Sequence, residues 1–178
     1  MSPDSRAGRV VITGYMGAGK TTVGRALARL LGVPFVDLDD AVAEDEGRGP
    51  RELIDGEGEE YFRAAETRAL RRVLEEGAAR VVATGGGAWT LERNRALVGE
   101  HGCVSVWLDA PYDLCRRRIE QEGATSERPF ARDPERAQRL YEERLAAYRL
   151  ADLRVRVAPG MSADALAARV AAALDTRV

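Results

Sequence analysis

Short apolar runs alternate with longer amphipathic segments along most of this chain. The apolar runs are rich in β-branched residues, which favours buried strands over buried helices. They span residues 9–13, 34–38, 80–84, 103–108 and 153–157. Strands that alternate with helices form βαβ units, so the pattern predicts an α/β fold with a mostly parallel sheet and helices on both faces.

The segments between these strands place apolar residues at helical spacing. Amphipathic helices are predicted within 20–32, 58–77, 134–150 and 162–174. The first two segments end on Gly32 and Gly77, because glycine readily adopts the left-handed conformation that closes a helix. Ser162 is the candidate N-cap of the last helix, since its side-chain oxygen can accept from an unpaired backbone N–H.

Length and pattern together predict a single domain that spans residues 1–178. The chain of 178 residues is long enough for one sizeable core, and it contains neither an internal repeat nor a low-complexity linker. Segment 120–135 differs from the rest because it is polar, contains glycine and two prolines, and has no apolar period. We therefore expect this segment to form a mobile flap outside the core.

Charge and composition argue against several kinds of partner. The formal net charge is −2, and acidic and basic residues are interleaved throughout, which does not favour nucleic acid or an anionic membrane. The polar N-terminus lacks a signal-peptide pattern, and no apolar run approaches the length of a membrane span. We therefore expect a cytoplasmic protein, and its small size without an obvious apolar patch favours a monomer.

The cysteines and the single histidine show no spacing typical of a metal or catalytic site. Cys103 and Cys115 are expected to be reduced and to pack as small apolar residues. His101 lies in a turn-like segment without a visible partner, so we interpret it as a surface residue.

The segment GYMGAGKTT, residues 14–22, matches the phosphate-loop motif G-x-x-x-x-G-K-[ST] between a predicted strand and a predicted helix. In such a loop, backbone N–H groups and the positive end of the helix face phosphate oxygens. Lys20 adds a point charge, and the Thr21 hydroxyl is a candidate ligand of Mg²⁺. The residues expected to bind the nucleotide here are Gly14, Gly17, Ala18, Gly19, Lys20, Thr21 and Thr22.

The acceptor of the phosphate is not defined by this loop. A guanine-binding switch protein needs an Asn-Lys-x-Asp motif, and the only asparagine, Asn94, is not followed by lysine. A small-molecule kinase, an ATPase and a nucleotide-binding module without transfer chemistry remain.

Two carboxylates follow the second predicted strand. Strand alternation would send Asp37 and Asp39 to the same side, at the edge of the sheet where α/β folds bind ligands. One could position Mg²⁺ through water, and the other could accept the proton of an attacking alcohol. Alternatively, Asp39 or Asp40 simply caps the next helix.

Three consecutive glycines, Gly85, Gly86 and Gly87, follow the third predicted strand. Glycines in this place indicate a close approach of a ligand to the backbone, although a tight turn would also use them. Three arginines are candidates for anion binding: Arg63 with Glu66 three residues later, Arg128 before Pro129, and Arg149 after Tyr148. Taken singly, each is better explained as a solvated surface charge, as most arginines are.

In this order, the phosphate loop, DLD, FRAAE, TGGGA, RP and AYR resemble the shikimate kinase family over roughly residues 9–157. That family has a doubly wound five-stranded parallel sheet in the order 2-3-1-4-5 with a mobile lid. It transfers the γ-phosphate of ATP to the 3-hydroxyl of shikimate. Ile54 stands where some family members have an aromatic residue, and Phe130 follows the lid proline where leucine is usual.

The resemblance implies a role for each matching residue. Lys20, Asp39 and Arg128 would be catalytic, with Arg128 delivered by a lid near 120–135 and also contacting the nucleotide. Thr21 and Asp37 would serve Mg²⁺, and Arg118, or its neighbour Arg117, would stack on adenine. A helical segment near 39–76 would help bind shikimate. Its ligands would be Asp39, Arg63, Gly85, Gly86, Gly87 and Arg149, with Glu66 orienting Arg63.

Two alternatives stay open beside a shikimate kinase. One is a phosphate-loop kinase for a related ring acid or sugar acid, which should show changes at Asp39, Arg63 or Arg149. The other is a regulatory nucleotide-binding module, which would be expected to lack Arg128 or the paired aspartates.

Overall fold

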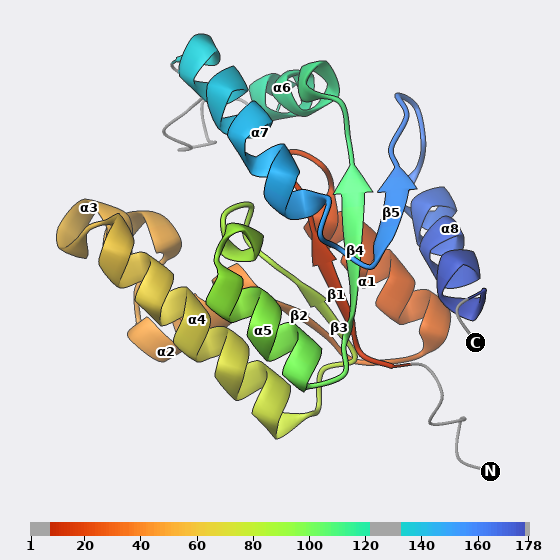
Figure 1. Cartoon of the computed structure of the whole chain (residues 1–178), viewed down its shortest axis with the longest axis horizontal. Coiled ribbons are helices and arrows are strands. Elements are labelled where there is room, and N and C mark those ends of the chain that lie inside the picture. The colour runs from red at the N-terminus through yellow and green to blue at the C-terminus, as the bar shows by residue number, and fades with distance from the viewer. Residues whose placement is uncertain (1–7, 122–132, 177–178) are drawn as a thin grey trace.

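A five-stranded parallel sheet forms the centre of the molecule (Figure 1). The computed structural model describes residues 8–121 and 133–176. The strand order β2-β3-β1-β4-β5 confirms the predicted order 2-3-1-4-5. The strands are β1 (Val10–Thr13), β2 (Phe35–Asp37), β3 (Val81–Ala83), β4 (Val104–Asp109) and β5 (Leu153–Arg156).

Helices cover both faces of this sheet. Helix α1 packs against α8 on one face, and α4 packs against α5 on the other (Figure 1). This arrangement follows from right-handed crossovers between parallel strands. The helices are α1 (Lys20–Leu31), α2 (Leu38–Glu46), α3 (Pro50–Glu57), α4 (Glu59–Glu76), α5 (Glu92–Glu100), α6 (Tyr112–Gln121), α7 (Pro134–Tyr148) and α8 (Ala163–Asp175), with a 3₁₀ turn η1 (Ala88–Thr90).

The helix ends agree with the predicted caps. Gly32 and Gly77 both adopt the left-handed conformation directly after α1 and α4. Ser162 accepts a hydrogen bond from the backbone N–H of Ala165 at the start of α8. Local side-chain chemistry therefore sets these three boundaries.

The core lies on both sides of β1, whose residues are all buried. Val11 of β1 stands in register with Val82 of β3 and Ser105 of β4, so β1 is shielded by a strand on each side. Trp89 and the two free cysteines, Cys103 and Cys115, are buried in the same apolar cluster. No helix in the described part of the chain is both long and apolar enough to cross a membrane.

Helices occupy both ends of segment 120–135, for which the sequence predicted a mobile flap. Helix α6 continues to Gln121, and α7 begins at Pro134 with Asp133 as its N-cap. Residues 122–132 lie outside the described residues, and with them Arg128 and Phe130.

Gly24 allows α1 to pack closely on β2. A Cβ at this position would lie 2.6 Å from the ring of Phe35. We predict that Gly24→Ala lowers the free energy of unfolding by about 1–2 kcal/mol, because overpacking outweighs the gain in helix propensity.

Gly99 in α5 is the matched control, since a Cβ there would meet nothing within 4 Å. Gly99→Ala should be neutral or stabilising by up to about 1 kcal/mol. Urea denaturation of both variants measures the difference, and equal effects would contradict the packing argument.

Candidate functional site

A cavity of about 710 Å³ opens at the carboxyl ends of the strands. Its walls come from the loop between β1 and α1, the start of α2, helices α3 and α4, the loop after β3, and helices α6, α7 and α8. This is the edge of an open α/β sheet at which ligands bind. Most residues singled out in the sequence meet here.

The phosphate loop forms one end of the cavity. Gly17 must be glycine, because its φ is +76° and a Cβ would lie 2.7 Å from the Cys115 carbonyl oxygen. The loop leads into α1 at Lys20, so the first N–H groups and the positive end of the helix face the cavity. Of the predicted nucleotide-binding loop residues, Gly17 to Thr22 line the cavity. Gly14 does not line the cavity. A Cβ at this position would lie 2.8 Å from the Leu108 carbonyl oxygen.

Lys20, Thr21 and Asp37 form a polar group beside this loop. The Lys20 Nζ donates to the Tyr15 carbonyl oxygen at 2.9 Å. The Thr21 hydroxyl donates to Asp37 Oδ2 at 2.6 Å, while Asp37 Oδ1 accepts from the backbone N–H of Asp39 at 3.0 Å. A hydroxyl beside a carboxylate is the kind of oxygen pair that suits Mg²⁺. The described residues contain no cluster of three or more metal-ligating side chains.

Asp37 and Asp39 both line the cavity, but not through the strand alternation that the sequence suggested. Strand β2 ends at Asp37, and Asp39 lies in the first turn of α2. The helix cap is Asp37, not Asp39 or Asp40. Asp40 points outward and is exposed, at 3.9 Å from Arg25. Asp37 therefore caps α2, and it is also the carboxylate to which the resemblance assigns the metal role.

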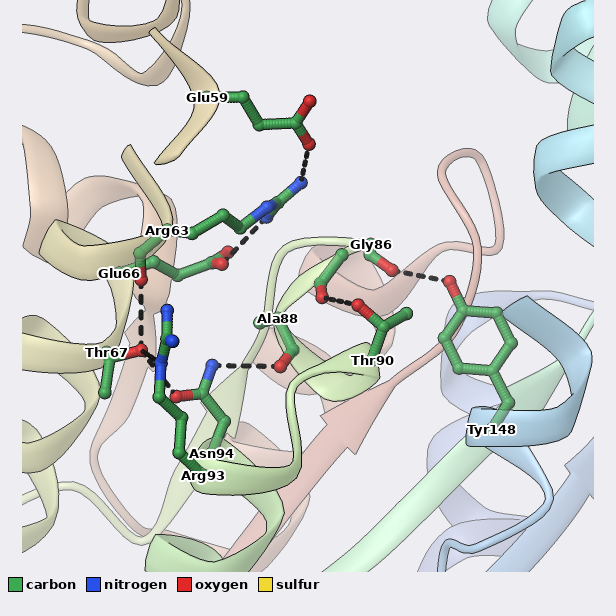
Figure 2. A network of polar contacts seen from close by, with 11 residues as sticks. Glu59, Arg63, Glu66, Thr67, Gly86, Ala88, Thr90, Arg93, Asn94 and Tyr148 are labelled. Atoms are coloured by element: carbon green, nitrogen blue, oxygen red, sulfur yellow. Dashed lines mark hydrogen bonds and ion pairs between the residues drawn. The ribbon is translucent and has the colours of Figure 1, made fainter. Parts of the chain in front are cut away.

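An ion pair between the half-buried Arg63 and the buried Glu66 forms the other end of the cavity. Arg63 Nη1 donates to Glu66 Oε2 at 2.8 Å, and Arg63 Nη2 donates to Glu59 Oε1 at 3.2 Å (Figure 2). Glu66 is fully buried, and its Oε1 has no hydrogen-bond partner among the described residues. Burial raises the pKa of Glu66, and the nearby Asp39 acts in the same direction against the opposing effect of Arg63.

The three glycines after β3 lie directly beneath charged side chains. A Cβ on Gly85 would lie 2.8 Å from Glu66 Oε1 and 3.0 Å from Asp39 Oδ1. On Gly87 it would lie 2.3 Å from Arg63 Nη2. The loop is also a turn, since the Ala88 N–H donates to the Gly85 carbonyl. The segment is therefore both a turn and a close approach of the backbone to charged side chains, and a Cβ on Gly85 or Gly87 would displace those side chains.

Arg149 does not lie where the resemblance placed it. It is exposed, follows the end of α7, and is absent from the cavity wall. Arg144, which the sequence reasoning missed, lines the cavity, with its Nη1 3.3 Å from the position of a Cβ on Gly86. Arg144 precedes Tyr148 by four residues and shares its helix face, whereas Arg149 is turned away by about 100°.

Tyr148 shows which face of α7 points inward. Its hydroxyl donates to the Gly86 carbonyl oxygen at 2.6 Å (Figure 2), and Trp89 Nε1 donates to the Ala147 carbonyl at 3.0 Å. The four-residue spacing between Arg144 and Tyr148 was the signal in the sequence that could have identified Arg144 as a cavity residue.

Arg118 lies over the phosphate loop. Its Nη1 donates to the carbonyl oxygens of Gly17 and Ala18 at 3.1 and 3.2 Å. Arg117, the competing candidate for adenine, is exposed and absent from the cavity wall. The structure therefore brings Arg118 into the candidate site and leaves Arg117 outside it.

Fold and cavity together define a phosphate-loop protein whose cavity has a second end lined by Arg63, Arg144, Asp39 and Glu66. The shikimate kinase family model matches residues 16–175. A shikimate kinase of Ruegeria pomeroyi is 44% identical over 171 residues, covering 94% of this chain and 85% of the relative. The chain therefore belongs to the shikimate kinase family.

Solved structures agree with this family. The shikimate kinase from Acinetobacter baumannii in complex with shikimate has a TM-score of 0.83 at 32% identity, covering 96% of this chain and 94% of that one. A gluconokinase from Sinorhizobium meliloti reaches a TM-score of 0.62 at 20% identity, which shows a shared fold alone.

The raised pKa of Glu66 predicts a pH-dependent contribution to stability. The folded protein holds this proton more tightly than the unfolded chain, so stability from this group falls as pH rises through the raised pKa. We predict that the free energy of unfolding of Glu66→Gln, relative to the unsubstituted protein, increases as the pH rises from the ordinary pKa of a glutamate, 4.5, through the raised pKa. Denaturant titrations across this range test it, and a decrease would mean that attraction to Arg63 outweighs burial.

Proposed function

We propose that this chain transfers the γ-phosphate of ATP to the 3-hydroxyl of shikimate, producing shikimate 3-phosphate and ADP. The observation that carries the proposal is the order of charges above three consecutive glycines. Asp39 lies over Gly85, Arg144 over Gly86 and Arg63 over Gly87.

This order matches an acceptor that carries a carboxylate at one end and hydroxyl groups at the other. Two guanidinium groups side by side suit a carboxylate, because each can donate paired hydrogen bonds to it. The Asp39 carboxylate at the opposite end accepts hydrogen bonds from hydroxyl groups. A ring acid such as shikimate therefore has one favourable orientation along the glycine loop.

The phosphate loop would hold the nucleotide at the other end of the cavity. Backbone N–H groups of residues 17–21 and the Lys20 ammonium would bind the phosphates, and Arg118 would contact adenine. This division places the transferred phosphoryl group between the two subsites, where positioning supplies much of the rate enhancement.

Mg²⁺ fits the polar group at the start of α1. Thr21 would bind the ion through its hydroxyl, and Asp37, 2.6 Å from that hydroxyl, would hold it through water. The bound ion would neutralise negative charge on the β and γ phosphates.

Asp39 is the candidate to orient the attacking hydroxyl and accept its proton. It lines the cavity at the start of α2, between the Thr21–Asp37 pair and the glycine loop. Arg128, which the resemblance assigns to the lid, would add positive charge near the transferring group. It lies outside the described residues.

We further propose that the protein is a monomer in the cytoplasm. Both cysteines in the described part of the chain are buried and unpaired, as expected where thiols stay reduced.

The first test is a coupled assay of ADP release with Mg·ATP. We expect turnover with shikimate and little with quinate, gluconate or no acceptor. Lys20→Ala is the inactive control, because it removes the charge that binds the phosphates. Preference for another acid would identify a different substrate for the kinase, and ADP release without any acceptor would indicate an ATPase.

The second test compares two arginines only five positions apart. We predict that Arg144→Ala raises the KM for shikimate about 10- to 100-fold, because a charge-assisted contact is lost, and changes the KM for ATP by less than about twofold. Arg149→Ala is the matched control and should alter neither constant by more than about twofold. A larger effect on shikimate from Arg149 would reverse the assignment.

A further inference from the structure

We propose that Asn94 is a positioning residue whose buried amide holds the Arg63 segment of α4 and the glycine loop at the separation needed for the acceptor's carboxylate. This inference rests on the proposed function and adds a determinant of acceptor affinity to it. Asn94 is absent from the cavity wall, so it would act through other groups.

Asn94 connects two elements that are far apart in the sequence. Its Nδ2 donates to the Ala88 carbonyl oxygen at 2.9 Å, directly after the glycine loop. Its Oδ1 accepts from the Thr67 hydroxyl of α4 at 2.8 Å. Figure 2 shows this amide between Thr67 and Ala88, below Arg63 in the view. Asn94 is only 1% exposed, so its amide has little access to water, whereas Thr67 is half-buried.

The orientation of the amide follows from its partners. A backbone carbonyl can only accept, so the donating Nδ2 must face Ala88 and Oδ1 must face Thr67. An aspartate would place an acceptor against the Ala88 carbonyl, and an alanine would reach neither partner. Among side chains of this size, the amide alone satisfies both contacts.

Thr67 carries the link back to Arg63. Its Oγ1 lies 3.0 Å from the Arg63 carbonyl oxygen and 2.8 Å from Asn94 Oδ1, so its single proton serves one of the two at a time. The same oxygen accepts from Arg93 Nε at 3.0 Å. The hydroxyl therefore joins the α4 backbone at Arg63 to the start of α5.

The separation matters because Arg63 and the loop lie so close together. A Cβ on Gly87 would lie 2.3 Å from Arg63 Nη2, so the guanidinium rests on the loop backbone. The Thr90 hydroxyl also donates to the Gly87 carbonyl at 2.6 Å, which restrains the loop. A shift of α4 relative to the loop would change the angle at which Arg63 meets a carboxylate, and such contacts depend strongly on angle.

The test compares Thr67→Val and Asn94→Leu with the unsubstituted enzyme in the ADP-release assay. Thr67→Val is isosteric and removes the hydroxyl that contacts Asn94, Arg93 and the Arg63 carbonyl, but it leaves the contact between Asn94 and Ala88 in place. Asn94→Leu removes both contacts of the amide, to Thr67 and to Ala88. We expect the KM for shikimate to rise about 3- to 10-fold while kcat and the KM for ATP change by less than about twofold. In an Arg63→Ala background, Thr67→Val should cause no further increase, because both changes act through the same contact.

Ser105→Ala separates positioning from loss of stability. The Ser105 hydroxyl is buried and bonds Asp152 between β4 and the start of β5, away from the cavity. The Ser105→Ala substitution should lower Tm but leave the KM for shikimate unchanged. An unchanged KM in folded Thr67→Val, or an equal rise in the KM for ATP, would overturn the proposal. If the unsubstituted enzyme fails to use shikimate, the proposed function falls first, and this inference with it.

Discussion

The buried pair between Arg63 and Glu66 is the constraint on which the acceptor half of the site depends. Burying a carboxylate is costly, and it is tolerated here because Arg63 donates to one of its oxygens. This pair fixes where the guanidinium lies, and the guanidinium in turn leaves no room for a side chain on Gly87. The glycine loop, the first turn of α2 and helix α7 are arranged around that fixed charge.

The two halves of the cavity are built in different ways. The phosphate end comes from one continuous stretch, the loop before α1 and the first turn of that helix. The acceptor end is assembled from α2, α4, the glycine loop and α7, which are distant in sequence. Buried hydrogen bonds hold these parts together, including those from Tyr148 to Gly86 and from Trp89 to Ala147. Local motifs suffice for the first end, whereas the second needs the whole fold.

The positions of the strands and of helices α1, α4, α7 and α8 were predictable because they follow from the period of apolar residues and from local caps at Gly32, Gly77 and Ser162. Helices α2, α3 and α6 were not identified from the apolar pattern. Helix α5 was not predicted, since its inward face carries the polar Asn94 beside Leu97 and Val98 and so lacks a clear apolar stripe. The end of β2 was also misjudged. Asp37 stops the strand by capping α2, so Asp39 reaches the cavity from a helix.

The sequence by itself determined the α/β fold, the phosphate loop and the residue types at the acceptor end, because these depend on local spacing and chemistry. Only the tertiary structure decided which arginine of α7 faces the glycines. Arg144 and Arg149 flank Tyr148, and the choice depends on how α7 is rotated, which Tyr148 sets by bonding to Gly86. Contacts between distant segments define that rotation, so a motif matched along the chain could not reveal it.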